Sequence, residues 1–269
     1  MNIFPCAKIN LGLNIVSKRS DGYHNLETVF YPIAINDILK ISDGKKEGLT
    51  LELEGNYIEC DLEKNLVFKT YDLLNNDFNL PPLHIVLNKN IPMQAGMGGG
   101  SSDGAYTIRL INDYCRLGLT IEEMERYAAR LGADCAFFIR AVPAYAEGIG
   151  EVLSPIRFSL ENYHIIVVKP PIAVSTREAF SNIHPAIPAK NCREVVLGQP
   201  IETWRDDLKN DFEDSIFPQY PQIAEIKQQL YDAGAVYASM TGSGSAVFGI
   251  FREQPELDFP ATQLFRASC

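Results

Sequence analysis

Residues 90–110 read NIPMQAGMGGGSSDGAYTIRL, which places five glycines and two serines between an expected strand at Leu83–Leu87 and an apolar helix. Clustered glycine costs conformational entropy, so it indicates that the backbone must come close to something that a side chain would block. A helix start without side chains leaves free N–H groups that form an anion site, and Ser101 or Ser102 is expected to cap this helix. The stretch therefore predicts a phosphate loop. A tight turn with close helix packing is the alternative. The helix has one apolar face, formed by Ala105, Ile108, Ile111 and Cys115.

Two standard phosphate motifs are absent from this stretch. The pattern G-x-x-x-x-G-K-[ST] fails because Ser101 stands where the second glycine belongs and no lysine follows. The pattern G-x-G-x-x-G, counted from Gly96, also needs glycine at Ser101. If the loop holds phosphate, it does so in another way.

The composition is that of a globular protein, with 46% hydrophobic and 22% charged residues in 269. The net charge of −10 argues against a general nucleic-acid binder, but a small phosphorylated ligand needs only local amides and one or two cations. No apolar run is long enough for a membrane span and no signal peptide opens the chain, so a cytoplasmic protein is expected. No C-x-x-C spacing occurs, which favours reduced, mostly buried thiols over a zinc site or disulfides for Cys6, Cys60, Cys115, Cys135, Cys192 and Cys269.

The pattern of apolar residues predicts both strands and helices. In PCAKINLGLNIV, alternation puts Ile9 and Leu11 on one face of a strand, and Lys8 and Asn10 on the other. The sequence TIEE at Thr120 is a capping box for a helix that ends at Gly132. Further helices are expected at Lys64–Asn75 and from Pro221 to near Gly234, and further strands at Thr28–Ile35, Ile38–Ile41, Leu49–Leu53, Tyr163–Lys169 and, as the last clear strand, Ala246–Phe251.

The order of these elements lacks a regular βαβ alternation, so an α+β fold is expected. A division near Leu153–Ser159 separates the glycine loop from a second set of strands and helices that begins at Tyr163. The expected domains are residues 1–155 and 156–269.

PMQAGMGGGSSDGA resembles the glycine motif of the GHMP kinases, the small-molecule kinases related to galactokinase, homoserine kinase and mevalonate kinase. PCAKINLGLNI and MTGSGSAVFGIF resemble the amino-terminal strand and carboxy-terminal glycine motif of that family, so the likeness covers residues 6 to about 251. The resemblance implies two α+β domains with the active site in the cleft between them. It also implies ATP as phosphate donor, with Mg²⁺ held mainly by the nucleotide's phosphates; no metal-binding residue is assigned.

RSDGYHNLETVF, LGADCAFFI and AYAEGIGEVL are similar to the GHMP kinases that phosphorylate the 2-hydroxyl of a CDP-linked methylerythritol in the non-mevalonate route to isoprenoids. The resemblance implies that Asp134 is the general base and that Lys8 holds the hydroxyl and stabilises charge. A capping aspartate and a solvated strand lysine are the alternatives for these two residues.

The same resemblance assigns the remaining site residues. Tyr23 and His24 hold the cytosine, Phe180 stacks on it, and imidazole suits a pyrimidine edge because it both donates and accepts hydrogen bonds. A surface-loop histidine and an ordinary core aromatic are the alternatives for His24 and Phe180. The other implied substrate contacts are Asn10, Thr176 and Gly242. Gly242 and Gly244 form either a hairpin turn or a second backbone cradle. The implied nucleotide contacts are Asn65, Leu66, Lys89, Pro92, Gly96, Met97, Gly98, Gly99, Gly100, Ser101 and Ser102.

The sequence departs from the family pattern at three places. Asp103 is expected to place a carboxylate near the triphosphate, Cys135 and Ala136 to loosen the turn after Asp134, and Gln94 with Ala95 to replace part of a glycine run. None of these removes a proposed catalytic group.

Three other functions remain open from the sequence. They are a GHMP kinase acting on homoserine, mevalonate or a sugar, a non-catalytic nucleotide-binding relative, and an RNA-binding module, which the net charge disfavours. The motif DGYHNLETVF speaks against the first, and the joint presence of Lys8 and Asp134 against the second. The oligomeric state is left open between a monomer and a weak dimer.

Overall fold

The computed structural model describes residues 1–56, 61–257, 259 and 262–267. The chain forms two compact units, each built from more than one segment of the sequence. Unit 1 consists of Met1–Ala7, Ile35–Met93 and Gly98–Ala141, and unit 2 of Lys8–Ala34, Gln94–Met97 and Val142–Cys269. These units differ from a single division near residue 155, because residues 8–34 and 94–97 belong to the same compact unit as the C-terminal part of the chain. Cys60 and Cys269 lie outside the described residues.

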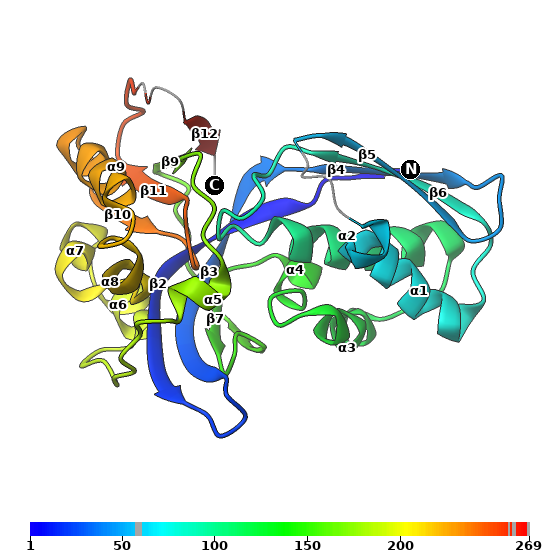
Figure 1. The fold of residues 1–269 in the computed structure, drawn as a ribbon, viewed down its shortest axis with the longest axis horizontal. Helices are drawn as coiled ribbons and strands as arrows, with labels where there is room; N and C mark the ends of the chain where they lie inside the picture. The colour runs from blue at the N-terminus through cyan, green and yellow to red at the C-terminus, as the bar shows by residue number, and fades with distance from the viewer. Residues whose placement is uncertain (57–60, 258, 260–261, 268–269) are drawn as a thin grey trace. The chain divides into compact units, whose positions relative to one another are not determined.

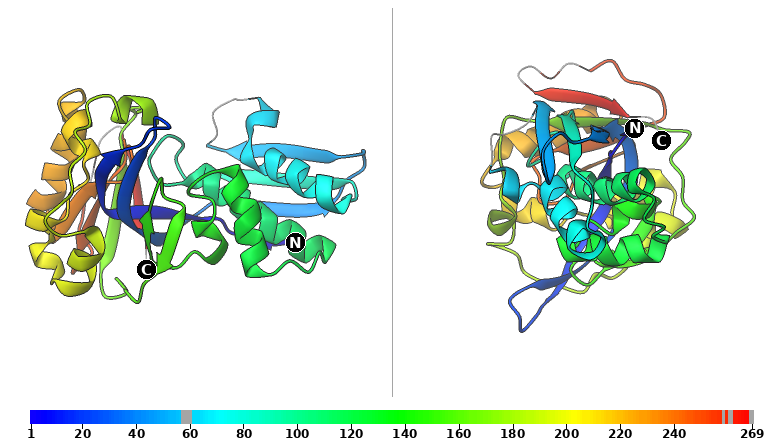
Figure 2. Two further views of the ribbon diagram at one scale, coloured as in Figure 1. Left: turned by 90° about the horizontal axis from the view of Figure 1, so that it is seen from below. Right: turned by 90° about the vertical axis from the view of Figure 1, so that its right-hand side faces the viewer.

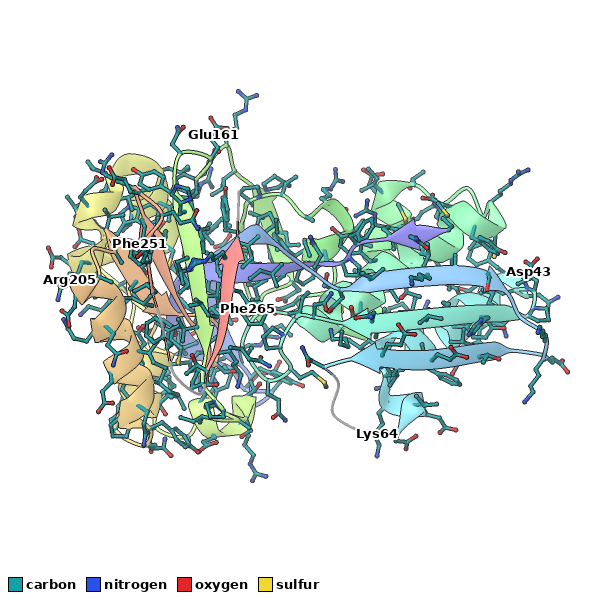
Figure 3. All side chains as sticks on the ribbon, turned by 90° about the horizontal axis from the view of Figure 1, so that it is seen from above. Asp43, Lys64, Glu161, Arg205, Phe251 and Phe265 are labelled. Atoms are coloured by element: carbon teal, nitrogen blue, oxygen red, sulfur yellow. The ribbon has the colours of Figure 1, made fainter. Side chains whose placement is uncertain are left out.

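Unit 1 is a four-stranded sheet covered by helices on one face (Figure 1). Figure 3 looks onto the other face, with Asp43 near one end of its strand. The sheet pairs its strands antiparallel except for β5 and β6, which run parallel. Its order is β1 (Asn2–Ile3), β4 (Ile38–Asp43), β6 (Leu83–Lys89) and β5 (Leu49–Gly55). The helices are η1 (Leu62–Lys64), α1 (Leu66–Phe78), α2 (Gly99–Cys115), α3 (Ile121–Leu131) and α4 (Phe137–Arg140).

The predicted helix starts of unit 1 are partly confirmed. Thr120 and Glu123 form the expected capping box of α3, and Gly132 ends that helix. The Asn65 side chain accepts a hydrogen bond from Val67 N and starts α1 two residues later than expected. The expectation that Ser101 or Ser102 caps α2 is wrong. The cap residue is Gly98, which has a positive φ of 71° and no side chain to offer.

Unit 2 contains two four-stranded sheets. The first has the order β2 (Cys6–Lys18), β3 (His24–Asn36), β7 (Ala144–Glu147) and β8 (Val152–Pro155). The second is antiparallel throughout, in the order β10 (Tyr237–Met240), β11 (Val247–Phe251), β9 (His164–Lys169) and β12 (Gln263–Ala267). The expectation of a last strand at Ala246–Phe251 missed β12, a short edge strand whose central residues are half-buried.

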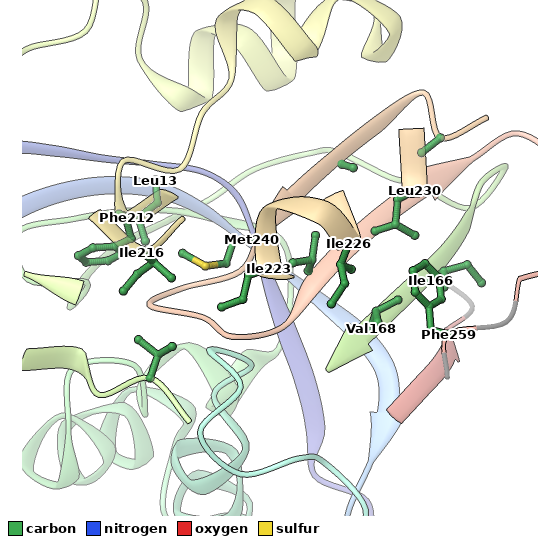
Figure 4. Packing of buried hydrophobic residues seen from close by; sticks show 14 of the residues in the cluster. Leu13, Ile166, Val168, Phe212, Ile216, Ile223, Ile226, Leu230, Met240 and Phe259 are labelled. Carbon is green, nitrogen blue, oxygen red and sulfur yellow. The ribbon is translucent and has the colours of Figure 1, made fainter. Parts of the chain in front are cut away.

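Two helices of unit 2, α7 and α9, pack on its second sheet, and Figures 1 and 2 show them on the same face of it. Apolar residues of α9, such as Ile223 and Leu230, meet strand residues Ile166 and Met240 in one core that also receives Leu13 from β2 (Figure 4). The helices are α5 (Thr176–Ala179), α6 (Cys192–Gly198), η2 (Ile201–Thr203), α7 (Trp204–Asp207), α8 (Phe212–Ile216) and α9 (Pro221–Asp232).

The strand β2 is buried on both faces over most of its length. The predicted alternation holds, but the polar face is also covered, and Lys8 is only 3% exposed. The alternative of a solvated lysine on an open strand is therefore wrong. A buried ammonium needs polar partners, and the contacts of Lys8 are the starting point of the functional site.

Candidate functional site

In unit 1, the start of α2 offers backbone N–H groups to a ligand. The first intrahelical hydrogen bond runs from Ser102 N to Gly98 O at 2.8 Å, so the amides of residues 99–101 precede the helical bonding pattern. Gly100 is exposed, and a Cβ atom built on it meets nothing within 4 Å. This geometry, open and rich in donors, suits an anion.

Ser102 supports the same interpretation. Its side chain is fully buried, and its Oγ has no hydrogen-bond partner among the described residues. A buried hydroxyl without a partner costs free energy, so a ligand or water that bonds to it would be favoured. A hydroxyl can donate a hydrogen bond to a phosphate oxygen, or bind Mg²⁺ through its oxygen.

Asp134 lies in the turn between α3 and α4, half-buried. The next residue, Cys135, is buried, and the Ser101 side chain lies near enough to its thiol to lower the pKa of that thiol, so the turn lies beside the start of α2 inside unit 1. Burial raises the pKa of Cys135 to about 11, which keeps the thiol protonated and unreactive. Cys135 N also donates to Gly132 O at 3.1 Å. The turn that carries Cys135 and Ala136 therefore keeps an internal backbone hydrogen bond.

Two charged residues expected near the nucleotide, Asp103 and Lys89, are paired with each other inside unit 1. Asp103 does not face an open triphosphate site, because its side chain is buried and accepts a hydrogen bond from Lys89 Nζ at 2.7 Å. Lys89 Nζ also pairs with Asp37, so its charge is already neutralised inside unit 1. Among the other expected nucleotide contacts, Asn65 and Leu66 begin α1, where Leu66 packs on Gly104 of α2, while Pro92 is buried.

In unit 2, the ammonium of Lys8 is held by uncharged oxygens. Lys8 Nζ donates to Asn10 Oδ1 at 2.5 Å and to Gly96 O at 2.9 Å, and it lies 5.1 Å from the centre of the Phe30 ring. Gly96 and Met97, from the first half of the glycine loop, thus attach to β2, and Lys8 N donates to Met97 O at 3.0 Å. The Met97 side chain is buried, so only its backbone is available to a nucleotide.

Two threonines fix Asn10, and sequence reasoning missed both. Asn10 Nδ2 donates to Thr28 Oγ1 at 3.0 Å, and Thr241 Oγ1 lies 3.1 Å from Asn10 Oδ1 and 3.2 Å from Gly96 O. Gly96 must be glycine here, since its φ is 71° and a Cβ atom would lie 1.9 Å from Thr241 O. Buried polar networks of this kind specify one arrangement when every member is satisfied.

The carboxy-terminal glycine motif is held by a residue that no motif indicated. Asn210 Nδ2, buried, donates to Met240 O at 2.7 Å and to Gly242 O at 2.9 Å. Gly242 and Gly244 both have positive φ, at 53° and 88°. This loop follows β10 and carries Thr241, so the turn that is expected to be a hairpin turn or a backbone cradle also orients Asn10.

Of the residues expected to hold the cytosine, His24 and Phe180 lie in contact with each other. The His24 and Phe180 rings stack with centroids 4.8 Å apart and planes 16° apart, and Phe180 packs edge-on against Phe212. Tyr23 is 62% exposed, and Thr176 is exposed at the start of α5. Phe180 is therefore both a core aromatic and half of a stacked pair.

The comparisons identify the family. Residues 65–141 match the model of the GHMP kinases N terminal domain, and residues 190–264 match that of the GHMP kinases C terminal domain. The chain belongs to the GHMP kinase family. Among the described residues, no group of three or more His, Cys, Asp or Glu is arranged to hold a metal ion, and none of the helices has the length and apolar character that a membrane crossing requires.

Within this family, similarity is high to proteins named 4-diphosphocytidyl-2-C-methyl-D-erythritol kinase. One from Bacteroides thetaiotaomicron is 53% identical over 97% of this chain and 95% of its own, and one from Porphyromonas gingivalis is 45% identical over 99% and 98%. The crystal structure of a 4-(cytidine 5'-diphospho)-2C-methyl-D-erythritol kinase superposes with a TM-score of 0.79 at 26% identity, covering 99% of this chain and 98% of that one. A homoserine kinase from Cytophaga hutchinsonii shares the fold, with a TM-score of 0.72 at 15% identity over 98% of this chain and 94% of that one.

Proposed function

We propose that this protein transfers the γ-phosphoryl group of ATP to the 2-hydroxyl of 4-(cytidine 5'-diphospho)-2-C-methyl-D-erythritol, a step of the non-mevalonate route to isoprenoid precursors. The observation that carries the proposal is the 45–53% identity, over nearly the whole chain, to kinases named for this substrate. The stacked His24–Phe180 pair adds chemical support, because a flat pyrimidine ring binds to aromatic faces.

The nucleotide phosphates bind at the start of α2 in this proposal. The amides of Gly99, Gly100 and Ser101 donate to the phosphate oxygens, and Ser102 Oγ gains the partner that it lacks. Asn65, Leu66 and Pro92 line the adenosine end. Lys89 is left out of direct contact, since Asp37 and Asp103 already hold its ammonium.

Mg²⁺ accompanies ATP and shares the charge of the phosphoryl group as it moves. We expect this ion to be held mainly by oxygens of the nucleotide and by water. The buried, unpartnered Ser102 Oγ is the protein oxygen that suits such an ion.

Asp134 accepts the proton of the 2-hydroxyl as that oxygen attacks the γ-phosphorus, and the bond from the γ-phosphorus to the bridging oxygen breaks to release ADP. Lys8 stabilises the negative charge that develops on the transferred group. Asn10 and Gly96 fix the Lys8 ammonium through uncharged oxygens, so its charge is not cancelled by these two contacts.

The cytidine end binds at Tyr23, His24, Thr176 and Phe180, and the diphosphate near Gly242. A base needs a spacing of about 3.5 Å on each side, so it stacks on the outer face of the His24–Phe180 pair or separates the two rings. Tyr23 is exposed and supplies a second aromatic face. Replacing Phe180 by leucine is expected to weaken cytidine binding by about 1–3 kcal/mol.

An ADP-release assay with four acceptors tests the proposal. The acceptors are the CDP-linked methylerythritol, homoserine, mevalonate and galactose, each with ATP and MgCl₂. The expected result is ADP release with the first alone, and its loss in Asp134→Asn, with Asp113→Asn on the exposed side of α2 as the matched control.

Release with another acceptor would assign the chain to a different substrate class. ADP binding without release for any acceptor would point to a non-catalytic relative. His24→Ala should weaken binding of CDP and leave ADP binding unchanged; the reverse would show that the base site is misassigned.

A further inference from the structure

A cluster of three charged side chains is buried beside the phosphate loop in unit 1. Lys89 Nζ, at the end of β6, donates to Asp103 Oδ2 at 2.7 Å and pairs with Asp37. Lys89 is 5% exposed, Asp103 is 3% exposed, and Asp37 is fully buried. Charged groups are rarely so buried, because removing each from water costs several kcal/mol.

The cluster joins three parts of the chain that meet at the loop. Asp37 Oδ1 accepts hydrogen bonds from Asn90 N at 2.6 Å and Ile91 N at 2.8 Å, which fixes the chain as it leaves β6. Asp103 stands just after the first turn of α2, the turn that presents the phosphate-binding amides. Lys89 connects the two carboxylates and therefore ties the entry of the loop to its exit.

The position of Gly99 shows how closely this packing approaches the helix start. A Cβ atom there would lie 2.9 Å from Ile91 Cγ2 and 3.3 Å from Lys89 Nζ. If the Lys89 ammonium or the Ile91 side chain moved toward α2, it would press against Gly99, the first residue of that helix. The backbone that binds phosphate and the charge cluster share one packed contact.

The charges of the cluster are not balanced, since two carboxylates surround one ammonium. Burial and the like charge of Asp37 raise the pKa of Asp103 well above its usual range, although Lys89 opposes this shift. Burial lowers the pKa of Lys89, but the two carboxylates outweigh it and the net shift is upward. Asp103 Oδ1 has no hydrogen-bond partner among the described residues, so no donor at this oxygen favours the ionised carboxylate.

We propose that Asp37, Lys89 and Asp103 are positioning residues that set the first turn of α2 for the nucleotide phosphates, and that Lys89 does not bind the nucleotide itself. This inference rests on the proposed function. Buried charge clusters often stabilise a fold no more than well-packed hydrophobic residues of the same volume do. What the charged cluster adds is directional bonding to two backbone amides and to one face of α2.

Calorimetric binding of the non-hydrolysable analogue AMPPNP, with MgCl₂, tests the proposal. Asp103→Leu is expected to weaken AMPPNP binding about tenfold, although it removes a negative charge. Asp103→Asn, which keeps an oxygen that accepts from Lys89, should restore binding to within about threefold of the wild type. Lys89→Met should weaken binding to the same extent as Asp103→Leu, and the double variant no further, because the two act as one unit.

The opposite result would identify a direct phosphate contact. If Lys89 leaves the cluster to bind phosphate, Asp103→Leu frees its charge and AMPPNP binds equally or more tightly. A lower melting temperature with unchanged AMPPNP affinity in all variants would also overturn the proposal, since the cluster would then serve the fold alone. Lys40→Met and Asp113→Asn, at exposed positions of unit 1, are the matched controls.

Amide hydrogen exchange gives a measurement that does not depend on any substrate. Asp103→Leu is expected to speed the exchange of the amides of residues 102–106 about tenfold, while the exposed control leaves it unchanged. Unaltered exchange would overturn the positioning role. If wild-type protein releases no ADP with any acceptor, the proposed function fails, whereas this measurement still decides the cluster.

Discussion

Lys8 and Lys89 are both buried lysines in the neighbourhood of the glycine loop, but they are held in different ways. Lys89 lies between two carboxylates, whereas the contacts that unit 2 gives Lys8 include an amide oxygen, a backbone carbonyl and an aromatic ring. A carboxylate beside an ammonium offsets much of its charge, whereas an uncharged oxygen orients an ammonium without contributing a charge of its own. In the roles proposed for these lysines, Lys89 positions the start of α2, and Lys8 stabilises the transferred phosphoryl group.

The largest effect is expected at the proposed base that works with Lys8. Asp134→Asn should lower kcat about 10²–10⁴-fold, because the amide cannot accept the hydroxyl proton. AMPPNP affinity should stay close to that of the wild type. Steady-state kinetics with the CDP-linked acceptor checks this. A kcat unchanged from the wild type would remove Asp134 from the base role.

The next largest effect separates the two lysines directly. Lys8→Met should lower kcat about 10²–10³-fold, because a charge aimed at the transition state is lost. Lys89→Met should act mainly on nucleotide affinity. Comparing kcat with the AMPPNP dissociation constant for both variants measures the contrast, with Lys18→Met at an exposed position of β2 as control. If both lysines gave the same profile, the distinction between them would be lost.

A smaller effect is expected at Thr28, which holds Asn10 and through it Lys8. Thr28→Val leaves Asn10 Nδ2 and the Gly12 carbonyl without their partner, at a cost of about 1–3 kcal/mol in the free energy of unfolding. The kcat should fall about tenfold as Lys8 loosens. Urea unfolding and steady-state kinetics check both expectations. Thr28→Ser keeps the hydroxyl and should behave like the wild type; equal losses in both variants would show that packing, not the hydrogen bond, matters.

The local features of the fold could be predicted because they depend on neighbours in the sequence. Three examples are the alternation of β2, the capping box at Thr120 and the glycine loop before α2. Each of these patterns is contained in a short stretch of the sequence. The cap of α2 was missed because serine is a common cap, whereas here Gly98 starts the helix through its backbone conformation alone. The interleaving of the two units was missed because no break in composition marks it.

The supporting residues of the site could not be predicted, because their partners are far away in the sequence. Asn10 and Thr241 are 231 residues apart, and Lys89 and Asp37 are 52 apart. A motif identified Asn10 and Lys89 but gave no sign of what each would contact. The sequence thus contained the groups proposed to touch ligand, while the groups that orient them became visible only in the folded chain.

The smallest expected effect is a pH dependence that sharpens the contrast between the lysines. The pKa of Asp103 is raised in the folded protein, so between about pH 4 and that raised pKa the folded state binds more protons than the unfolded state. The carboxyl group therefore contributes stability at low pH that is lost as the pH rises through this window, with a slope of at most about 1.4 kcal/mol per pH unit. Asp103→Asn lacks this proton, so the free energy of unfolding of the wild type minus that of the variant should fall as the pH rises from 4. Urea unfolding at several pH values measures this difference, and a difference that stays constant or rises would mean that Asp103 is ionised throughout and that Lys89 sits between two full charges.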